Sequence, residues 1–96
     1  MYCYVYMLAN NTNTVVYTGV TSNLSQRVYQ HKNDMDPKSF TAKYAVHKLV
    51  YYEVTDHMWA ALEREKQIKK WNRARKNKLI SGMNPKWEDL YESILE

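Results

Sequence analysis

The stretch YCYVYMLANNTNTVVYTGV, residues 2–20, decides the fold of this 96-residue chain. Even-numbered side chains from Tyr2 to Leu8 fall on one side of an extended segment and odd-numbered ones on the other, which predicts a strand with two different faces. The turn-forming residues 10–14 follow, and residues 15–20 predict a second strand. We therefore expect a β-hairpin, in which Gly19 marks a bulge or a close backbone approach.

The remaining elements follow from apolar periodicity and from capping residues. Asn23 is a plausible N-cap with Gln26 three residues on, and Asn84-Pro85 predicts another helix start. We expect a loop over 33–44, a third strand over 45–55, and helices over 24–32, 56–71, 74–81 (ended by Gly82) and about 85–95. The prediction is an α+β fold with a three-stranded mixed or antiparallel sheet flanked by helices, in the order β-β-α-β-α-α-α and in a single domain over residues 1–96.

Composition excludes several classes of protein. Hydrophobic residues make up 45% and charged residues 25% of the chain, which is typical of a globular domain rather than a disordered one. No run of 18 apolar residues is present, and no basic segment precedes the first apolar stretch, so we expect neither a membrane span nor a secretory signal. Cys3 is the only cysteine, which excludes an internal disulfide and favours a reducing, cytoplasmic location.

The net charge of +4 is concentrated in one stretch. Residues 63–78 hold eight cations and two acids, whereas the rest of the chain holds six cations and eight acids. A solvated helical face with internal ion pairs is one interpretation. A surface that contacts phosphates is the other. We expect Trp59, Trp71 and Trp87 to lie in the core rather than to stack on bases, and Trp71 is of interest because it lies beside the basic stretch.

Three side chains are predicted on inward helical faces although they are polar. On the 24–32 helix, Arg27 and His31 share the apolar side with Val28. On the 56–71 helix, Glu65 falls within the apolar stripe of Met58 and Leu62, whereas Glu63 falls on the opposite face. A desolvated carboxylate costs several kcal/mol unless an ion, a cation or hydrogen bonds compensate it.

Together these residues supply the parts needed to hydrolyse a phosphodiester. A carboxylate can hold a divalent metal, an arginine can stabilise charge on a phosphate, and a histidine or phenol can move a proton. The residues in question are Tyr6, Tyr17, Arg27, His31 and Glu65. Structural alternatives stay open: the two tyrosines could be a packed cross-strand pair, Arg27 and Glu65 an internal ion pair, and His31 a satisfied core histidine.

The sequence resembles the GIY-YIG nuclease superfamily. Tyr4-Val5-Tyr6 and Tyr17-Thr18-Gly19 stand at its two half-motifs, with ten residues between Tyr6 and Tyr17. Arg27 and His31 then match an R-x-x-x-H arrangement, and residues 61–69 resemble its A-x-x-x-E…IK element. Within the superfamily, the chain is most similar to small stand-alone, uncharacterised bacterial proteins of the YhbQ/YazA type. It departs at Tyr4, where the motif has glycine, and at Thr18, where it has isoleucine; neither side chain is one assigned chemistry.

This resemblance implies DNA cleavage that depends on one Mg²⁺ or Mn²⁺ ion, with a place in DNA repair or recombination. It implies that Tyr6 accepts a proton from the attacking water or positions it, that Tyr17 orients the phosphate, and that Arg27 stabilises the phosphorane. Glu65 would hold the metal, and His31 is an alternative proton acceptor. Asn77 could fill the place of an asparagine that some members have after the glutamate. DNA contacts are expected from Lys43, Lys69, Lys70, Arg73, Arg75 and Lys76.

Two other functions stay open. The chain could be a catalytically weak nucleic-acid-binding module that uses the basic stretch 64–78, or a protein-interaction domain that docks an acidic partner. The sequence favours a monomer and leaves the DNA target undefined, because little of the chain remains for base readout.

Overall fold

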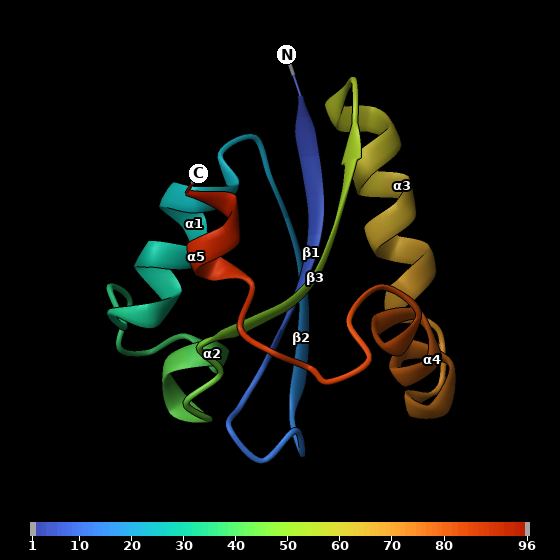
Figure 1. The fold of residues 1–96 in the computed structure, drawn as a ribbon. Coiled ribbons are helices and arrows are strands. Elements are labelled where there is room, and N and C mark those ends of the chain that lie inside the picture. The colour runs from blue at the N-terminus through green and yellow to red at the C-terminus, as the bar shows by residue number, and fades with distance from the viewer. Residues whose placement is uncertain (1, 96) are drawn as a thin grey trace.

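The computed structural model describes residues 2–95 as a three-stranded antiparallel sheet between two layers of helices (Figure 1). The strand order is β2-β1-β3, so β1 is central and both neighbours are edge strands. Helices α1, α2 and α5 cover one face, and α3 and α4 cover the other. The elements are β1 (Cys3–Ala9), β2 (Val16–Thr21), α1 (Leu24–Lys32), α2 (Phe40–Lys43), β3 (Lys48–Thr55), α3 (Met58–Lys69), α4 (Arg73–Met83) and α5 (Tyr91–Ile94).

The predicted α+β fold and element order are confirmed, with one addition. The loop expected over 33–44 contains the single-turn helix α2, which begins because the Ser39 side chain accepts a hydrogen bond from the amide of Ala42. Asn23 caps α1 in the same way, through the amide of Gln26. Among the described residues, no helix is long and apolar enough to cross a membrane.

The alternation of β1 divides the interior into two cores, as its sequence pattern predicts. Cys3, Val5 and Met7 pack with Ala61 and Ile68 of α3. On the other face, the core around Tyr6 and Leu8 contains Leu24 and Val28 of α1, Val46 and Leu49. Since successive strand residues point to opposite faces, Tyr6 is committed to the α1 side of the sheet.

The β1–β2 turn is built by one asparagine. The Asn10 side-chain oxygen accepts hydrogen bonds from the amides of Thr14 and Val15, at 2.9 and 3.0 Å. Asn13 adopts a left-handed conformation with φ of 58°, which asparagine tolerates better than most residues. The resulting register places Gly19 of β2 directly opposite Tyr6 of β1.

Two predictions about the C-terminal third were wrong. The helix expected over about 85–95 is reduced to α5, because Asn84 caps no helix there: its side chain donates to the carbonyls of Val50 and Glu88, at 3.1 and 2.8 Å. Trp87 then takes φ of 52°, which is not helical. Gly82 does not end α4, which runs on to Met83 with Gly82 inside it.

The segment after Asn84 runs from the α4 side of the sheet to the α1 side (Figure 1). There the Asp89 carboxylate accepts a hydrogen bond from the amide of Leu49, and Leu90 donates its own amide to the Leu49 carbonyl. Lys32 of α1 also forms an ion pair with Asp89. We call residues 84–90 the C-terminal strap.

The apolar stripe predicted for α3 was also misplaced. Ala61 and Ile68 are fully buried against the sheet, but Met58, Trp59 and Leu62 are exposed. The face that packs is therefore rotated away from Met58 and Leu62, and the prediction that all three tryptophans are core residues was wrong for Trp59.

Candidate active site

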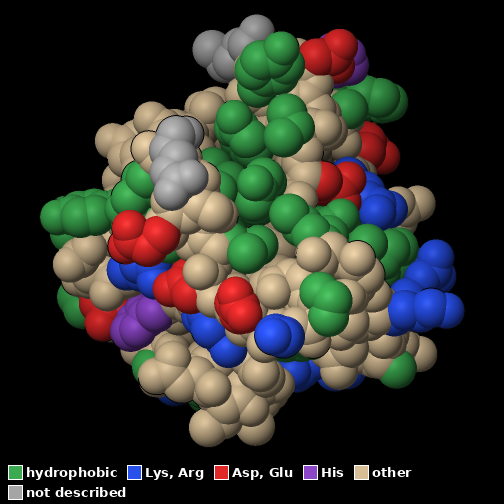
Figure 2. All heavy atoms as spheres, in the orientation of Figure 1, with side chains coloured by type: hydrophobic (Ala, Val, Ile, Leu, Met, Phe, Trp, Pro, Cys, Tyr) green, Lys and Arg blue, Asp and Glu red, His purple; other side chains and the backbone are tan. Residues whose placement is uncertain are grey.

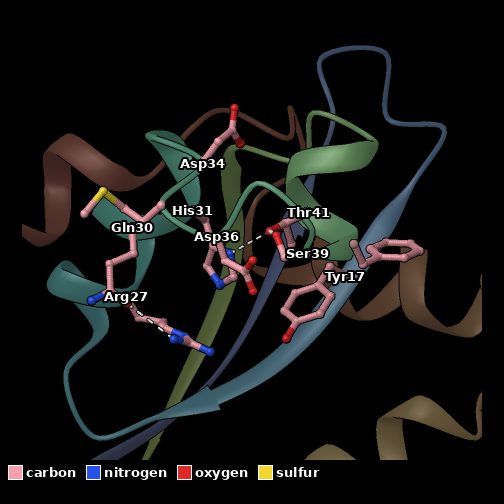
Figure 3. Close-up of a pocket in the computed structure, with 10 residues that line it drawn as sticks. Tyr17, Arg27, Gln30, His31, Asp34, Asp36, Ser39 and Thr41 are labelled. Carbon is pink, nitrogen blue, oxygen red and sulfur yellow. Dashed lines mark hydrogen bonds between the residues drawn. The ribbon is translucent and has the colours of Figure 1, made fainter.

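A hollow of about 370 Å³ opens on the α1 side of the sheet. Its wall is formed by Tyr17 of β2, by Arg27 and His31 of α1, and by Ser39 and Thr41 at the start of α2 (Figure 3). The short helix α2 matters because it brings two hydroxyl side chains against α1. Three sequence-predicted residues, Tyr17, Arg27 and His31, thus line one pocket. A fourth, Tyr6, contacts His31 from the interior.

Tyr6 is buried behind His31, which lines the hollow, and touches it. The phenol is 1% exposed, and its oxygen lies 2.9 Å from Nε2 of the His31 ring. Tyr17 packs against both rings, with centroid distances of 6.2 Å to Tyr6 and 5.5 Å to His31. The cross-strand aromatic packing that the sequence left open is therefore present, and it coexists with a polar contact at the centre.

His31 is held at both ring nitrogens. Nδ1 lies 2.9 Å from the Thr41 hydroxyl, which lies 3.1 Å from the Ser39 hydroxyl (Figure 3). Two hydrogen-bond directions satisfy these groups. In one, Nδ1–H donates to Thr41, so that Nε2 accepts from Tyr6; in the other, Thr41 donates to Nδ1 and Nε2–H donates to the Tyr6 oxygen.

The electrostatics keep both Tyr6 and His31 neutral near pH 7. Burial, together with the positive charge of Arg27 and a smaller electrostatic contribution from His47, lowers the pKa of His31 from 6.5 to about 4. Burial raises the pKa of Tyr6 well above 10, as does neighbouring Tyr17, while Arg27 opposes the shift. In the direction in which Nδ1–H donates to Thr41, the Nε2 lone pair faces the Tyr6 hydroxyl and can accept its proton, whereas the buried phenol resists ionisation.

Gly19 leaves the space that Tyr6 occupies. A Cβ atom at this position would lie 2.5 Å from the Tyr6 oxygen, 2.6 Å from its Cζ and 2.9 Å from Cε2 of Tyr17. Its φ angle is not positive, so the glycine is required for close approach rather than for backbone conformation. The strand glycine that the sequence singled out therefore sits beneath the two tyrosines.

Arg27 lies at the rim of the hollow rather than inside the protein. The residue is exposed, and its Nη1 donates to the Gln30 side-chain oxygen at 3.3 Å. Its guanidinium is near enough to influence the pKa values of both Tyr6 and His31. An exposed cation beside a neutral Tyr–His pair is available to an anionic ligand.

Glu65 does not line this hollow, and α3 covers the other face of the sheet. At about 100° per residue, Glu65 lies roughly 100° around α3 from Arg64, with the sheet-facing Ala61 and Ile68 between them. Arg64 pairs with Glu53 of β3 at 3.1 Å, so Glu65 points toward β2. Tyr17 and Glu65 thus flank the edge strand β2 from opposite faces.

The donor set around Glu65 suits one kind of metal site. Its side chain is 18% exposed, and Lys69 Nζ lies 3.5 Å from a carboxylate oxygen. Across residues 2–95 no group of three His, Cys, Asp or Glu side chains could hold an ion on protein ligands alone. Mg²⁺ commonly keeps several waters and binds one or two carboxylates together with substrate phosphates. Glu65 fits an ion shared with a phosphate and does not fit an all-protein cage.

Comparison with known proteins identifies the family. The model of the GIY-YIG catalytic domain matches residues 2–79. The chain belongs to the GIY-YIG family. Members of this family are generally nucleases that use a divalent metal.

The similar relatives are uncharacterised UPF0213 proteins. One from Syntrophus aciditrophicus is 39% identical over 82 residues, covering 85% of this chain and 92% of the relative. CPE1444 from Clostridium perfringens is 37% identical over 91 residues, covering 95% and 96%. The solution NMR structure of BH0048 from Bacillus halodurans superposes with a TM-score of 0.58 at 25% identity, covering 93% of each chain. The recognition and the fold inferred from the GIY-YIG motifs are confirmed.

The predicted DNA-contacting cations lie on different elements, and several have partners within the protein. Lys43 lies on α2, over the ring of Tyr44. Lys69 pairs with Glu65, and Arg75 stacks on Trp71 at 4.1 Å from the ring centre. Lys70 and Lys76 lie near the end of α3 and within α4.

Arg73 and Asn77 form structural hydrogen bonds. The Arg73 guanidinium donates to the backbone carbonyls of Asn13 and Thr14, and its Nε donates to Asn77 at 2.8 Å. These bonds attach the start of α4 to the β1–β2 turn, and neither residue lines the hollow beside Tyr17.

Sequence reasoning missed Thr41 and Ser39. Thr41 is buried although it lies in a segment predicted to be a polar loop. The available signal was the S-x-x-A pattern of a helix N-cap at Ser39, which would have placed a short helix there. Nothing in the local sequence indicates that its threonine reaches a histidine ten residues earlier.

Proposed function

We propose that this protein is an endonuclease that hydrolyses phosphodiester bonds in DNA with one Mg²⁺ or Mn²⁺ ion. The observation that carries the proposal is the 2.9 Å contact between Tyr6 and His31, beneath the exposed Arg27, in a chain of the GIY-YIG family. A neutral histidine against a buried phenol provides a path for a proton out of the site.

The chain's own residues divide the work as follows. Tyr6 takes a proton from the attacking water while passing its own hydroxyl proton to Nε2 of His31, so the phenol never carries a full charge. The raised pKa of Tyr6 agrees with a phenol that stays protonated. His31 is neutral and can receive the proton, but its lowered pKa of about 4 disfavours the imidazolium, so the negative charge that develops on the phosphate has to stabilise it. Arg27 stabilises the negative charge that develops on the phosphate, and Tyr17 orients it from the neighbouring strand.

Glu65 is proposed to hold the divalent ion, which would polarise a phosphate oxygen when bound. For Glu65 and Tyr17 to act on one phosphate, the substrate has to pass around the edge strand β2, because Tyr17 lies on the other face of that strand. Lys69 competes for the same carboxylate at 3.5 Å in the resting protein.

Plasmid nicking in Mg²⁺ tests this proposal. Glu65→Gln and Arg27→Ala should each reduce the rate by at least about 100-fold, since each removes stabilisation of the transition-state charge. Glu92→Gln is the control, because Glu92 is an exposed carboxylate on α5, outside both hollows, and should leave the rate unchanged. Glu65→Gln and Arg27→Ala cutting at the wild-type rate would show that the activity is a contaminant.

A nucleic-acid-binding module with little turnover is the second candidate. The Glu65–Lys69 ion pair and the Trp71 ring between Arg64 and Arg75 favour it, because they describe a cationic surface with an occupied carboxylate. This module predicts affinity that falls steeply with salt and survives Glu65→Gln without cleavage. A pull-down that resists nuclease treatment would instead support a protein-interaction domain.

We further propose that residues 1–96 act as one domain, as a monomer, and in the cytoplasm. The buried thiol of Cys3, the only cysteine in the sequence, suits a reducing compartment. DNA is the proposed partner, and DNA repair or recombination is the proposed setting. Sedimentation at several protein concentrations tests the oligomeric state.

A further inference from the structure

The first half of α3 exposes large apolar side chains to solvent. Trp59 is 71% exposed, and Met58 and Leu62 beside it are also exposed. In Figure 2, hydrophobic, basic and acidic side chains lie side by side along the right-hand side of the molecule, where Figure 1 places α3. An exposed tryptophan is uncommon, because its large apolar ring is usually mostly buried.

A hollow of about 520 Å³ runs along this helix and contains both the tryptophan and the proposed metal ligand. Trp59 and Leu62 supply its apolar part, and Lys66, Lys69 and Lys70 supply positive charge. Two carboxylates, Glu63 and Glu65, line the same hollow, so its three lysines leave an excess of one positive charge. Among residues 2–95, Lys66 and Lys70 form no ion pair, so both are available to an anion.

This combination selects one kind of occupant. Aromatic side chains that stack on bases, together with cations that follow the backbone, are how proteins bind single strands without sequence preference. A paired base cannot offer its face to Trp59, because its neighbours in the duplex already cover it. We infer that α3 binds a DNA strand with unpaired bases, one base stacking on Trp59 while Lys66 and Lys70 contact its phosphates.

The distance along the helix relates this base to the cleavage position. Six residues separate Trp59 from Glu65, which is about 9 Å at 1.5 Å per residue. A stacked strand advances about 3.4 Å per nucleotide, so the stacked base lies roughly two to three nucleotides from a phosphate at Glu65. This relation to a cut phosphate rests on the proposed function, and it makes the preferred substrate a DNA with an unpaired strand beside the scissile bond.

Binding without catalysis tests the inference. The probes are a fluorescently labelled single-stranded oligothymidine and a blunt duplex of the same length, titrated with wild-type protein in EDTA and followed by anisotropy. Trp59→Ala should weaken oligothymidine binding by about 5- to 100-fold, whereas Trp59→Phe should retain most of it because it keeps a stacking ring. Duplex affinity should change by less than about twofold in both variants, since the lysines contribute the sequence-independent charge.

Tyr29→Ala is the matched control, since Tyr29 is an exposed aromatic residue on α1 and outside this hollow. Equal loss of single-strand affinity in Tyr29→Ala and Trp59→Ala would overturn the inference, as would no loss in Trp59→Ala. Trp59→Ala that abolishes self-association in sedimentation but leaves DNA binding intact would also overturn it, and would identify a second copy as the occupant.

Cleavage measured separately keeps the two proposals distinct. Single-strand binding that depends on Trp59, with no nicking by any preparation, would refute the proposed nuclease and leave the binding surface established. Nicking that depends on Glu65, together with single-strand binding that is unchanged in Trp59→Ala, would support the proposed nuclease and refute the binding surface. Unchanged thermal midpoints for Trp59→Ala and Trp59→Phe show that the variants are folded.

Discussion

Replacing Gly19 by alanine should disrupt the centre of the site. The new methyl group would lie 2.5 Å from the Tyr6 oxygen and 2.6 Å from its Cζ. Favourable contacts begin near 3.5 Å, so the ring must move by about 1 Å. Tyr6 is fully buried between two packed faces, which leaves it no open space to enter.

The cost follows from two separate effects. Overpacking a filled interior costs about 1–3 kcal/mol. A shift of about 1 Å also stretches the 2.9 Å contact between Tyr6 and His31 past hydrogen-bonding range, and a buried polar group left unpaired costs about 1–3 kcal/mol more. We expect Gly19→Ala to reduce the free energy of unfolding by about 2–5 kcal/mol and to abolish nicking.

Urea denaturation measures the effect, with two further variants for comparison. The midpoint should fall by on the order of 1 M or more for Gly19→Ala. Gly82→Ala is the matched control, because a methyl group there meets nothing within 4 Å; inside helix α4 it should stabilise by about 0.5–1 kcal/mol. Tyr6→Leu removes the two closest atoms, so the double variant should be more stable than the sum of the single effects by about 1–3 kcal/mol.

Strict additivity of the Gly19→Ala and Tyr6→Leu effects would refute this account of the contact. A Gly19→Ala midpoint equal to that of the wild type would refute it as well, because it would mean that the Tyr6 ring has room to move.

Three further changes test the site and the strap. The pKa of His31 is about 4 in the folded protein and 6.5 in the unfolded chain, so the unfolded chain binds the extra proton between these pH values. The free energy of unfolding should therefore fall as the pH drops from about 6.5 to 4, by on the order of 3 kcal/mol at most. His31→Gln should reduce this pH dependence when unfolding is followed in urea. Thr41→Val removes the hydrogen-bond partner of His31 Nδ1 and should reduce the nicking rate by about 100-fold, whereas Thr41→Ser should preserve the rate. In ¹⁵N NMR of the wild type, the His31 proton should lie on Nδ1; a proton on Nε2 instead would contradict the proposed direction of proton transfer. Asn84→Ala leaves the Val50 and Glu88 groups unpaired and should cost about 2–4 kcal/mol in thermal or urea unfolding, whereas a loss below about 0.5 kcal/mol would show that water replaces the amide.

The parts of the fold that local sequence dictates were predicted from it. The alternation of β1 assigned Tyr6 to the face that it occupies, and Asn23 with Leu24 and Val28 gave α1 with the bounds that the structure has. Strand alternation and helix periodicity likewise placed Tyr6 and His31 on the faces that are buried, although periodicity also predicted an inward Arg27, which is exposed. The proposed roles of these residues stay predictions.

Features that depend on distant contacts were not predicted. The buried face of α3 is chosen by how Ala61 and Ile68 fit the sheet, and the apolar character of Met58 and Leu62 gives no information on that choice. Asn84 precedes a proline, as an N-cap would, but its side-chain amide donates a hydrogen bond to the carbonyl of Val50, 34 residues earlier in the sequence. Thr41 was missed because its partner lies on another helix.

The C-terminal strap has a consequence for how this small sheet stays separate from other chains. Strand β3 is an edge, and its Leu49 amide and carbonyl are occupied by Asp89 and Leu90 rather than left open. Unpaired edge groups are a template for strand addition from a neighbouring molecule. The strap lies beyond the matched residues 2–79, so a chain cut back to the catalytic region would expose that template and tend to aggregate through β3.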